Sequence, residues 1–282
     1  MESIIKLREK SSSFTKQEMH SILTNSKLVT SLTSEFPDSR LYAIWRIAAL
    51  SEIPYAIELD YTKRLITYIN DTIATTDGFS YTGKIDDIVP CYNAMVLEAY
   101  CKLGLYNTKE VQNAITWIKQ YQLFDRNLKT SWTKKGITKH GGCLNEVPCY
   151  IGIGKTVKAL LWYNKYVDND DIKELINKGI VYMKKHKFFK RIHSDKFIYK
   201  HITDISFPPS YMFNVVELAE ITYLANIPYD DKKDLIDYIN SMKKDNGWKN
   251  TYVYTGKGYI AFDGKKKEAT FTSYILNKYI SE

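Results

Sequence analysis

The sequence predicts an all-α fold, namely an α/α toroid of about five helical hairpins with inner and outer helix rings and small hairpin-like loops on one rim. The first observation is an aromatic anchor that follows a proline or a small residue and recurs about every sixty residues. The second is that an apolar run begins at each anchor and an amphipathic segment follows it. The anchors, which are 50, 58, 61 and 60 residues apart, are Tyr42, Tyr92, Tyr150, Tyr211 and Phe271.

The chain length of 282 residues suits one large domain. We therefore expect residues 1–282 to form a single toroid domain that opens with a helical segment and then repeats one unit. The expected divisions are an N-terminal helical segment at 1–37, repeats at 38–89, 90–147, 148–208 and 209–268, and a last inner helix within 269–282.

The helix that follows each anchor is expected to lie in the inner ring. These segments carry apolar residues on more than one face, and helices that are apolar nearly all round are buried. The inner helices are expected at residues 41–51, 91–103, 150–163, 211–225 and 271–280. The segments at 174–182 and 234–239 instead show the three- and four-residue apolar spacing of surface helices, which predicts an outer ring.

Two helical segments have no sequential partner, residues 16–32 and 271–280. If they pack on each other, they close the ring as a further pair. An open solenoid of helical repeats is the alternative. The closed ring is favoured because the inner helices are so uniformly apolar and because the long loops all fall on one rim, where such loops are usually functional.

Two loop elements recur within the repeats. The tetrapeptide Tyr-Thr-Gly-Lys at residues 81–84 returns unchanged at 254–257, and a Thr-Gly pair between aromatic flanks predicts a small hairpin or a tight turn. Residues 77–79 and 246–248 also correspond, as Asp-Gly-Phe and Asn-Gly-Trp.

The composition is that of an ordinary globular protein, with 44% hydrophobic and 26% charged residues and a formal charge of +8. A basic surface suits an acidic partner or an anionic substrate, but no nucleic-acid-binding motif accompanies the lysine clusters. No segment reaches the ~18 apolar residues that a membrane span needs, and no signal-peptide core is present. The sequence therefore predicts a soluble, cytoplasmic protein whose four cysteines are reduced thiols.

Residues 77–79 and 246–248, together with the Gly-Gly-Cys…Pro-Cys-Tyr stretch at 141–150, resemble motifs of the squalene cyclase and protein prenyltransferase superfamily. The resemblance covers residues 38–282 as architecture. It implies a site in a central funnel that is lined by the N-termini of the inner helices and the adjoining loops.

Three departures from that superfamily limit the chemistry. Val147 stands where zinc prenyltransferases have an aspartate ligand, and Phe271 or Thr272 stands where they have a histidine. Zinc sites need three or four ligands, so we expect neither a metal nor another cofactor. The cyclase-type acidic motif is also absent, and its nearest match at residues 168–171 predicts a helix N-cap.

The strongest candidate site lies at residues 140–150, because it combines a base, two thiols, a carboxylate and a phenol. Cys149 is expected near a helix N-terminus, where the helix dipole favours the thiolate, and His140 could activate it as a nucleophile. The alternative is that small core residues are simply needed behind each proline. The predicted catalytic residues are Cys149, His140, Asp86 and Glu146.

Acidic residues precede three anchors at the same rim position, where they suit a general acid or base or the capping of inner helices. Tyrosine, with 23 copies, suits the wall of a half-wet cavity. The predicted substrate-binding residues are Cys91, Tyr92, Asn93, Tyr150, Tyr211, Asp204 and Phe271.

The first functional hypothesis is a biosynthetic transferase or cyclase of prenyltransferase- or terpenoid-cyclase-like architecture, acting on a small-molecule, peptide or lipid-like substrate in the central funnel. Thiol-dependent acyl or peptidyl transfer by Cys149 and His140 is the second, and carbohydrate cleavage by a lyase or hydrolase is the third. A non-catalytic binding scaffold with a basic rim is the fourth hypothesis.

Overall fold

The chain folds into helices and connecting turns. A computed structural model describes residues 1–10, 13–134, 147–245, 247–265 and 268–280. Within these ranges no β-strand forms, and the isolated bridges join Ala74 to Phe79, Lys190 to Phe197 and Lys244 to Gly247. The predicted all-α class is therefore confirmed. The predicted rim hairpin at residues 81–84 is a tight turn, closed by a 2.9 Å bond from the Gly83 amide to the Ser80 carbonyl.

Twelve helices follow one another along the described chain, with both short and long connections between them. They are α1 Glu2–Glu9, α2 Lys16–Thr24, α3 Lys27–Thr33, α4 Arg40–Ser51, α5 Asp60–Thr72, α6 Pro90–Lys102, α7 Lys109–Tyr121, α8 Tyr150–Asn164, α9 Asp170–Lys185, α10 Val215–Leu224, α11 Tyr229–Ser241 and α12 Thr270–Ile280. Short 3-10 turns are η2 Ala56–Glu58, η3 Ile85–Asp87 and η5 Lys200–Thr203.

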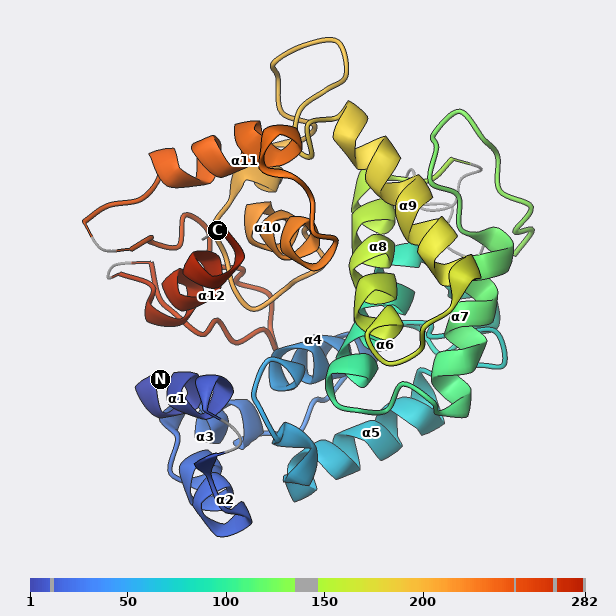
Figure 1. The fold of residues 1–282 in the computed structure, drawn as a ribbon. Helices are drawn as coiled ribbons and strands as arrows, with labels where there is room; N and C mark the ends of the chain where they lie inside the picture. Colours follow the sequence, from blue (N-terminus) through green and yellow to red (C-terminus); the bar gives the residue numbers. More distant parts are fainter. Residues whose placement is uncertain (11–12, 135–146, 246, 266–267, 281–282) are drawn as a thin grey trace.

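Two kinds of helix alternate along the chain from α4 onward. The apolar helices α4, α6, α8, α10 and α12 pack one against the next in that order. The amphipathic helices α5, α7, α9 and α11 lie further from the middle of the molecule (Figure 1). Helix α9 shows why, because it buries Ile172, Ile176 and Ile180 on one face and exposes lysines on the other. The alternation predicted from the apolar spacing is therefore present.

The N-terminal segment differs from the sequence prediction. The single helix expected over residues 16–32 is divided into α2 and α3, because Ser26 caps a new helix by accepting the Val29 amide. Helix α12 packs against α10 and α1. Helix α1 was not expected as its partner, yet it buries Ile4 and Leu7 and places the Arg8 guanidinium 6.0 Å from the centre of the Phe271 ring.

Most anchors mark helix starts, but Tyr211 does not. Helix α6 begins at Pro90 and α8 begins at Tyr150. Helix α10 begins only at Val215, because the Asn214 side chain accepts the amides of the next turn and fixes the start there. The predicted start at Tyr211 is therefore wrong, and this tyrosine lies in the turn before the helix.

Candidate functional site

A network of buried charges links the apolar helices. Its cations are Arg8, Lys102, Lys155 and Lys158, and its anions are Glu52, Glu98, Glu217 and Glu220. The side chains of α6, α8 and α10 in this set are at most 7% exposed. On each of these helices the two charged residues are three or four positions apart, so they share one face. We call this set the charge network.

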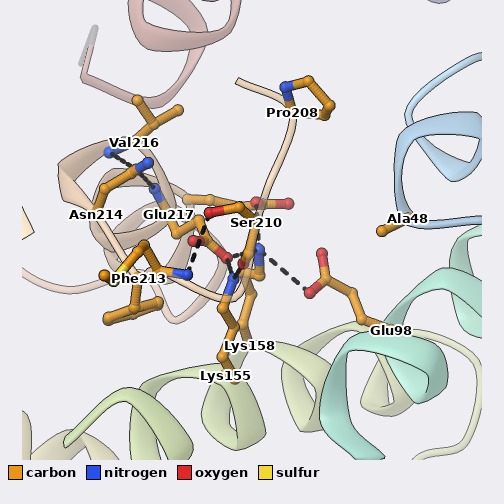
Figure 2. A network of polar contacts seen from close by, with 12 residues as sticks. Ala48, Glu98, Lys155, Lys158, Pro208, Ser210, Phe213, Asn214, Val216 and Glu217 are labelled. Atoms are coloured by element: carbon orange, nitrogen blue, oxygen red, sulfur yellow. Dashed lines mark hydrogen bonds and ion pairs between the residues drawn. The ribbon is translucent and has the colours of Figure 1, made fainter. Parts of the chain in front are cut away.

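The contacts of the charge network are short. The ammonium groups of Lys155 and Lys158 lie 2.6 Å and 2.5 Å from Oε1 of Glu217 (Figure 2). On its other side Lys158 lies 3.2 Å from Glu98 Oε2. These bonds connect α6, α8 and α10 through side chains, so the space between the three helices at this level is occupied by ion pairs.

The second half of the charge network centres on Lys102. Its ammonium lies 2.5 Å from Glu52 and 2.6 Å from Glu98, and 3.2 Å from Glu220. Four cations face four carboxylates in the whole network, so its formal charge is balanced. Buried charges persist only when they are paired in this way, because the cost of removing each from water is several kcal/mol.

The pKa values of the two lysines of α8 shift in opposite directions. Burial alone lowers the pKa of Lys158, but the carboxylates of Glu217, Glu98 and Glu220 outweigh it, so the pKa is raised. Burial also lowers the pKa of Lys155, and there Glu217 does not fully compensate, so its pKa remains lowered. Lys155 donates a second bond of 2.5 Å to the Ser210 carbonyl.

A tyrosine cluster lies beside Lys155 at the N-terminal end of the apolar helices. We define it as Tyr81, Tyr92, Tyr211 and Tyr254, which are all half-buried. The ring centres of Tyr81 and Tyr92 are 5.1 Å apart, and those of Tyr211 and Tyr254 are 5.8 Å apart. Burial, followed by nearby titrating groups, raises the pKa of Tyr92, Tyr211 and Tyr254, so these phenols are neutral at physiological pH.

Two cysteines border the tyrosine cluster. Burial, with Cys149 as the next cause, raises the pKa of the Cys91 thiol to about 12, so this group is protonated at neutral pH. Cys149 is half-exposed at the N-cap of α8, where its Sγ accepts the Gly152 amide at 3.2 Å. Both lie at helix N-terminal ends, where the sequence placed them. Cys143 lies outside the described residues.

A histidine–aspartate pair adjoins the same end of the molecule. His201 Nδ1 lies 2.7 Å from Asp204 Oδ2, and the His201 ring is 4.9 Å from the ring of Tyr252. Tyr252 in turn influences the pKa of both Tyr211 and Tyr254, which places the pair next to the tyrosine cluster. Sequence analysis did not select His201 as a site residue. The three-residue spacing between His201 and Asp204 was the signal that could have found the pair.

Several predicted substrate-binding residues serve packing elsewhere. The side-chain oxygen Oδ1 of Asn93 accepts a 2.9 Å hydrogen bond from the Phe79 backbone amide, and the Asn93 side chain is buried. The Tyr150 phenol donates to the Phe188 carbonyl, between α8 and the end of α9. Phe271 is stacked 5.4 Å from another aromatic ring, that of Phe207. The structure therefore brings Cys91, Tyr92 and Tyr211 together. Asn93, Tyr150 and Phe271 lie outside the tyrosine cluster.

The predicted acids are also separated. Asp86 is exposed in η3, while its neighbour Asp87 accepts a 2.6 Å bond from the Thr82 hydroxyl. Asp204 belongs to the pair with His201. His140 and Glu146 lie outside the described residues, so the predicted partnership with Cys149 stays a prediction.

The same described ranges lack two other features. No group of three or more His, Cys, Asp or Glu side chains in them is placed to hold a metal ion. No helix in them is long and apolar enough to cross a membrane.

Comparison of the sequence with protein-family models yields no match, and a search of curated proteins also yields none.

Proposed function

We propose that the chain is an α/α toroid of the cyclase or prenyltransferase type, with the apolar helices as the inner ring and the amphipathic helices as the outer ring. The serial packing of α4, α6, α8, α10 and α12 supports this arrangement, as does the outer position of the amphipathic helices (Figure 1). The proposal makes the N-terminal end of the inner helices the functional end.

The substrate is an apolar molecule that carries positive charge during the reaction, and it contacts the tyrosine cluster. The observation that carries this proposal is the convergence of half-buried, neutral phenol rings from separate segments of the chain. Aromatic faces attract a cation by ~0.5–2 kcal/mol each, without offering it a nucleophilic anion. The charge network lies deeper along the same helices, so the substrate binds at the rim.

His201 is the proton acceptor in this proposal. Asp204 holds the imidazole at Nδ1 and stabilises the imidazolium, which leaves Nε2 to take a proton. Removal of a proton beside a carbocation turns the C–H electron pair into a carbon–carbon double bond, and the proton goes to Nε2. General bases of this kind typically contribute about 100- to 10,000-fold in rate.

The test is conversion of linear isoprenoids, offered as allylic diphosphates with Mg²⁺ and as neutral polyenes, with products followed by gas chromatography and mass spectrometry. We expect a cyclised or eliminated product from one class, and a loss of about 100-fold or more in turnover for His201→Gln. His193→Gln is the matched control, because His193 has no place beside the tyrosine cluster. Lack of product from both classes contradicts the proposal.

Thiol-dependent transfer by Cys149 is the second candidate. The observation that favours it is the half-exposed Sγ at a helix N-cap, because that position favours the thiolate. It predicts that Cys149→Ser abolishes acyl transfer from a thioester probe and that Cys91→Ser does not. Equal activity of the two variants counts against this candidate.

A further inference from the structure

A cavity of about 360 Å³ lies at the opposite, C-terminal end of the apolar helices. It is formed where α4, α6 and α8 end, and α1 covers one side. Its volume is within the range of ~300–1,000 Å³ that small-molecule sites occupy. The walls combine apolar residues with three aromatic side chains, Tyr55, Trp162 and Tyr166, and with the charged residues Arg8, Glu52 and Lys102.

Arg8 lines this cavity and does not use all of its donors. Its Nη1 donates to the carbonyl and the carboxylate of Glu52, at 3.1 Å and 3.3 Å. The described residues offer no acceptor to Nε and Nη2 of Arg8, although an arginine fork can hold a carboxylate through two parallel bonds. Burial works against the charge, but Glu52 and other neighbours outweigh it and raise the pKa of Arg8, so the guanidinium stays charged.

Two more cations, Lys165 and Lys278, lie close to residues that line the cavity. The Lys165 ammonium lies 4.0 Å from the centre of the Trp162 ring. Burial lowers the pKa of Lys165. Glu220 opposes this effect and the charges of Lys278, Lys102 and Arg8 add to it, so these groups lie near one another. Within the described chain neither Lys165 nor Lys278 forms an ion pair.

The local charge is therefore positive. The four carboxylates of the charge network are already matched by its own four cations, and Lys165 and Lys278 add positive charge to that balance. The C-terminal ends of α4, α6 and α8 carry partial negative charge, which favours lysines here even without a ligand. That charge is spread over several carbonyls, of which the Glu52 carbonyl already accepts from Arg8, so it does not cancel two full cations.

We infer that this cavity binds a small planar organic anion, an aromatic carboxylate. Arg8 would take the carboxylate, with Lys165 and Lys278 adding long-range attraction, and the ring would lie against Trp162 and Tyr166. This site is independent of the proposed function, because it lies at the other end of the helices and shares no residue with the tyrosine cluster.

The experiment uses three probes of one shape and different charge: benzoate, benzamide and benzamidine. The full chain is labelled with 5-fluorotryptophan, and its five tryptophan signals are followed by fluorine NMR, with Trp162 assigned through Trp162→Phe. Benzoate is expected to shift the Trp162 signal and to bind about tenfold or more tightly than benzamidine. The other four tryptophans serve as internal controls.

Two substitutions of Tyr166 with opposite charge separate an effect of charge on binding from an effect on folding. Tyr166 is 43% exposed, so either substitution is compatible with the fold, which thermal unfolding verifies. Tyr166→Glu is expected to weaken benzoate binding about tenfold or more, and Tyr166→Lys to keep or strengthen it. The inference is overturned if benzamide binds as well as benzoate, if the Trp162 signal does not move, or if the two variants bind benzoate equally.

Discussion

Helices α6 and α8 carry one kind of side chain at their start and another kind in the turns that follow. At the start of these helices lie the buried Cys91 and the partly exposed Tyr92 and Cys149, which are uncharged or weakly ionising groups. Two turns further along the same helices lie the fully charged and buried side chains of the charge network. The comparison teaches that in this chain full charge is used for connecting helices, while neutral aromatic and thiol groups face the accessible end.

Removing one carboxylate from the charge network is the largest expected effect. Glu217→Gln leaves Lys155 and Lys158 buried without their shared partner and should lower the free energy of unfolding by about 3–5 kcal/mol. Urea denaturation measures it. The matched control is Glu174→Gln, which breaks an exposed pair with Lys178 and should cost about 0–1 kcal/mol. A loss of similar size in both variants would show that the buried network does not connect the helices.

The next largest effect is a loss of stability in acid, which should come from the charge network and not from the tyrosine cluster. Burial alone raises the pKa of Glu220, but Lys102 and Lys158 outweigh it, so the folded pKa is lowered below the ordinary 4.5. Its stabilising contribution is therefore present above pH 4.5 and is lost as pH falls toward the folded pKa, by up to about 1.4 kcal/mol per pH unit.

The measurement is the urea midpoint at several values between pH 6 and pH 3. Glu220→Gln should flatten this dependence, and Glu174→Gln should keep the wild-type slope. An unchanged slope in Glu220→Gln would refute the assignment of this acid sensitivity to the charge network.

A smaller effect is expected at the tyrosine cluster. Benzyltrimethylammonium, a stable cation, should lose about three- to tenfold in affinity on Tyr92→Leu, because one aromatic face is removed. Tyr92→Phe keeps the face and should bind as the wild type does. Isothermal calorimetry measures both, and equal binding by all three proteins would argue that the cluster does not stabilise cations.

The smallest change concerns the two cysteines. Iodoacetamide at pH 8 should alkylate Cys149 while Cys91 stays unmodified, because burial raises the pKa of the Cys91 thiol to about 12. Peptide mass spectrometry reads the two positions separately. Preferential labelling of Cys91 would show that Cys91, and not Cys149, is the accessible thiol.

The sequence contained enough to predict the helical class and the alternation of helix types, because both follow from local apolar spacing. It also located Cys149 at the N-terminus of one helix and Tyr92 in the first turn of another. It did not reveal the charge network, since Glu98 stands inside an apolar run and Lys155 and Lys158 look like ordinary surface lysines. Their pairing depends on contacts between helices that are about sixty residues apart, which no local pattern encodes.

The tyrosine cluster was predicted only in part for a similar reason. Tyr254 comes from a loop whose path is set by tertiary contacts, and its ring lies 5.0 Å from that of Trp45 on α4. Tyr211 was expected on a helix and lies before it, because the strong cap at Asn214 determines where α10 begins. Cap chemistry was readable from the sequence, but the convergence of the loops was not.

The balanced charge network also bears on how such a chain can change over generations. Chains of similar repeats readily gain or lose a unit by duplication or deletion. Here each apolar helix carries a distinct set of charges, and deleting α8 with α9 would remove two buried cations and leave the carboxylates of α6 and α10 short of partners. Loss of one pair of helices would therefore cost far more than its own packing, because each buried charge left without a partner costs several kcal/mol.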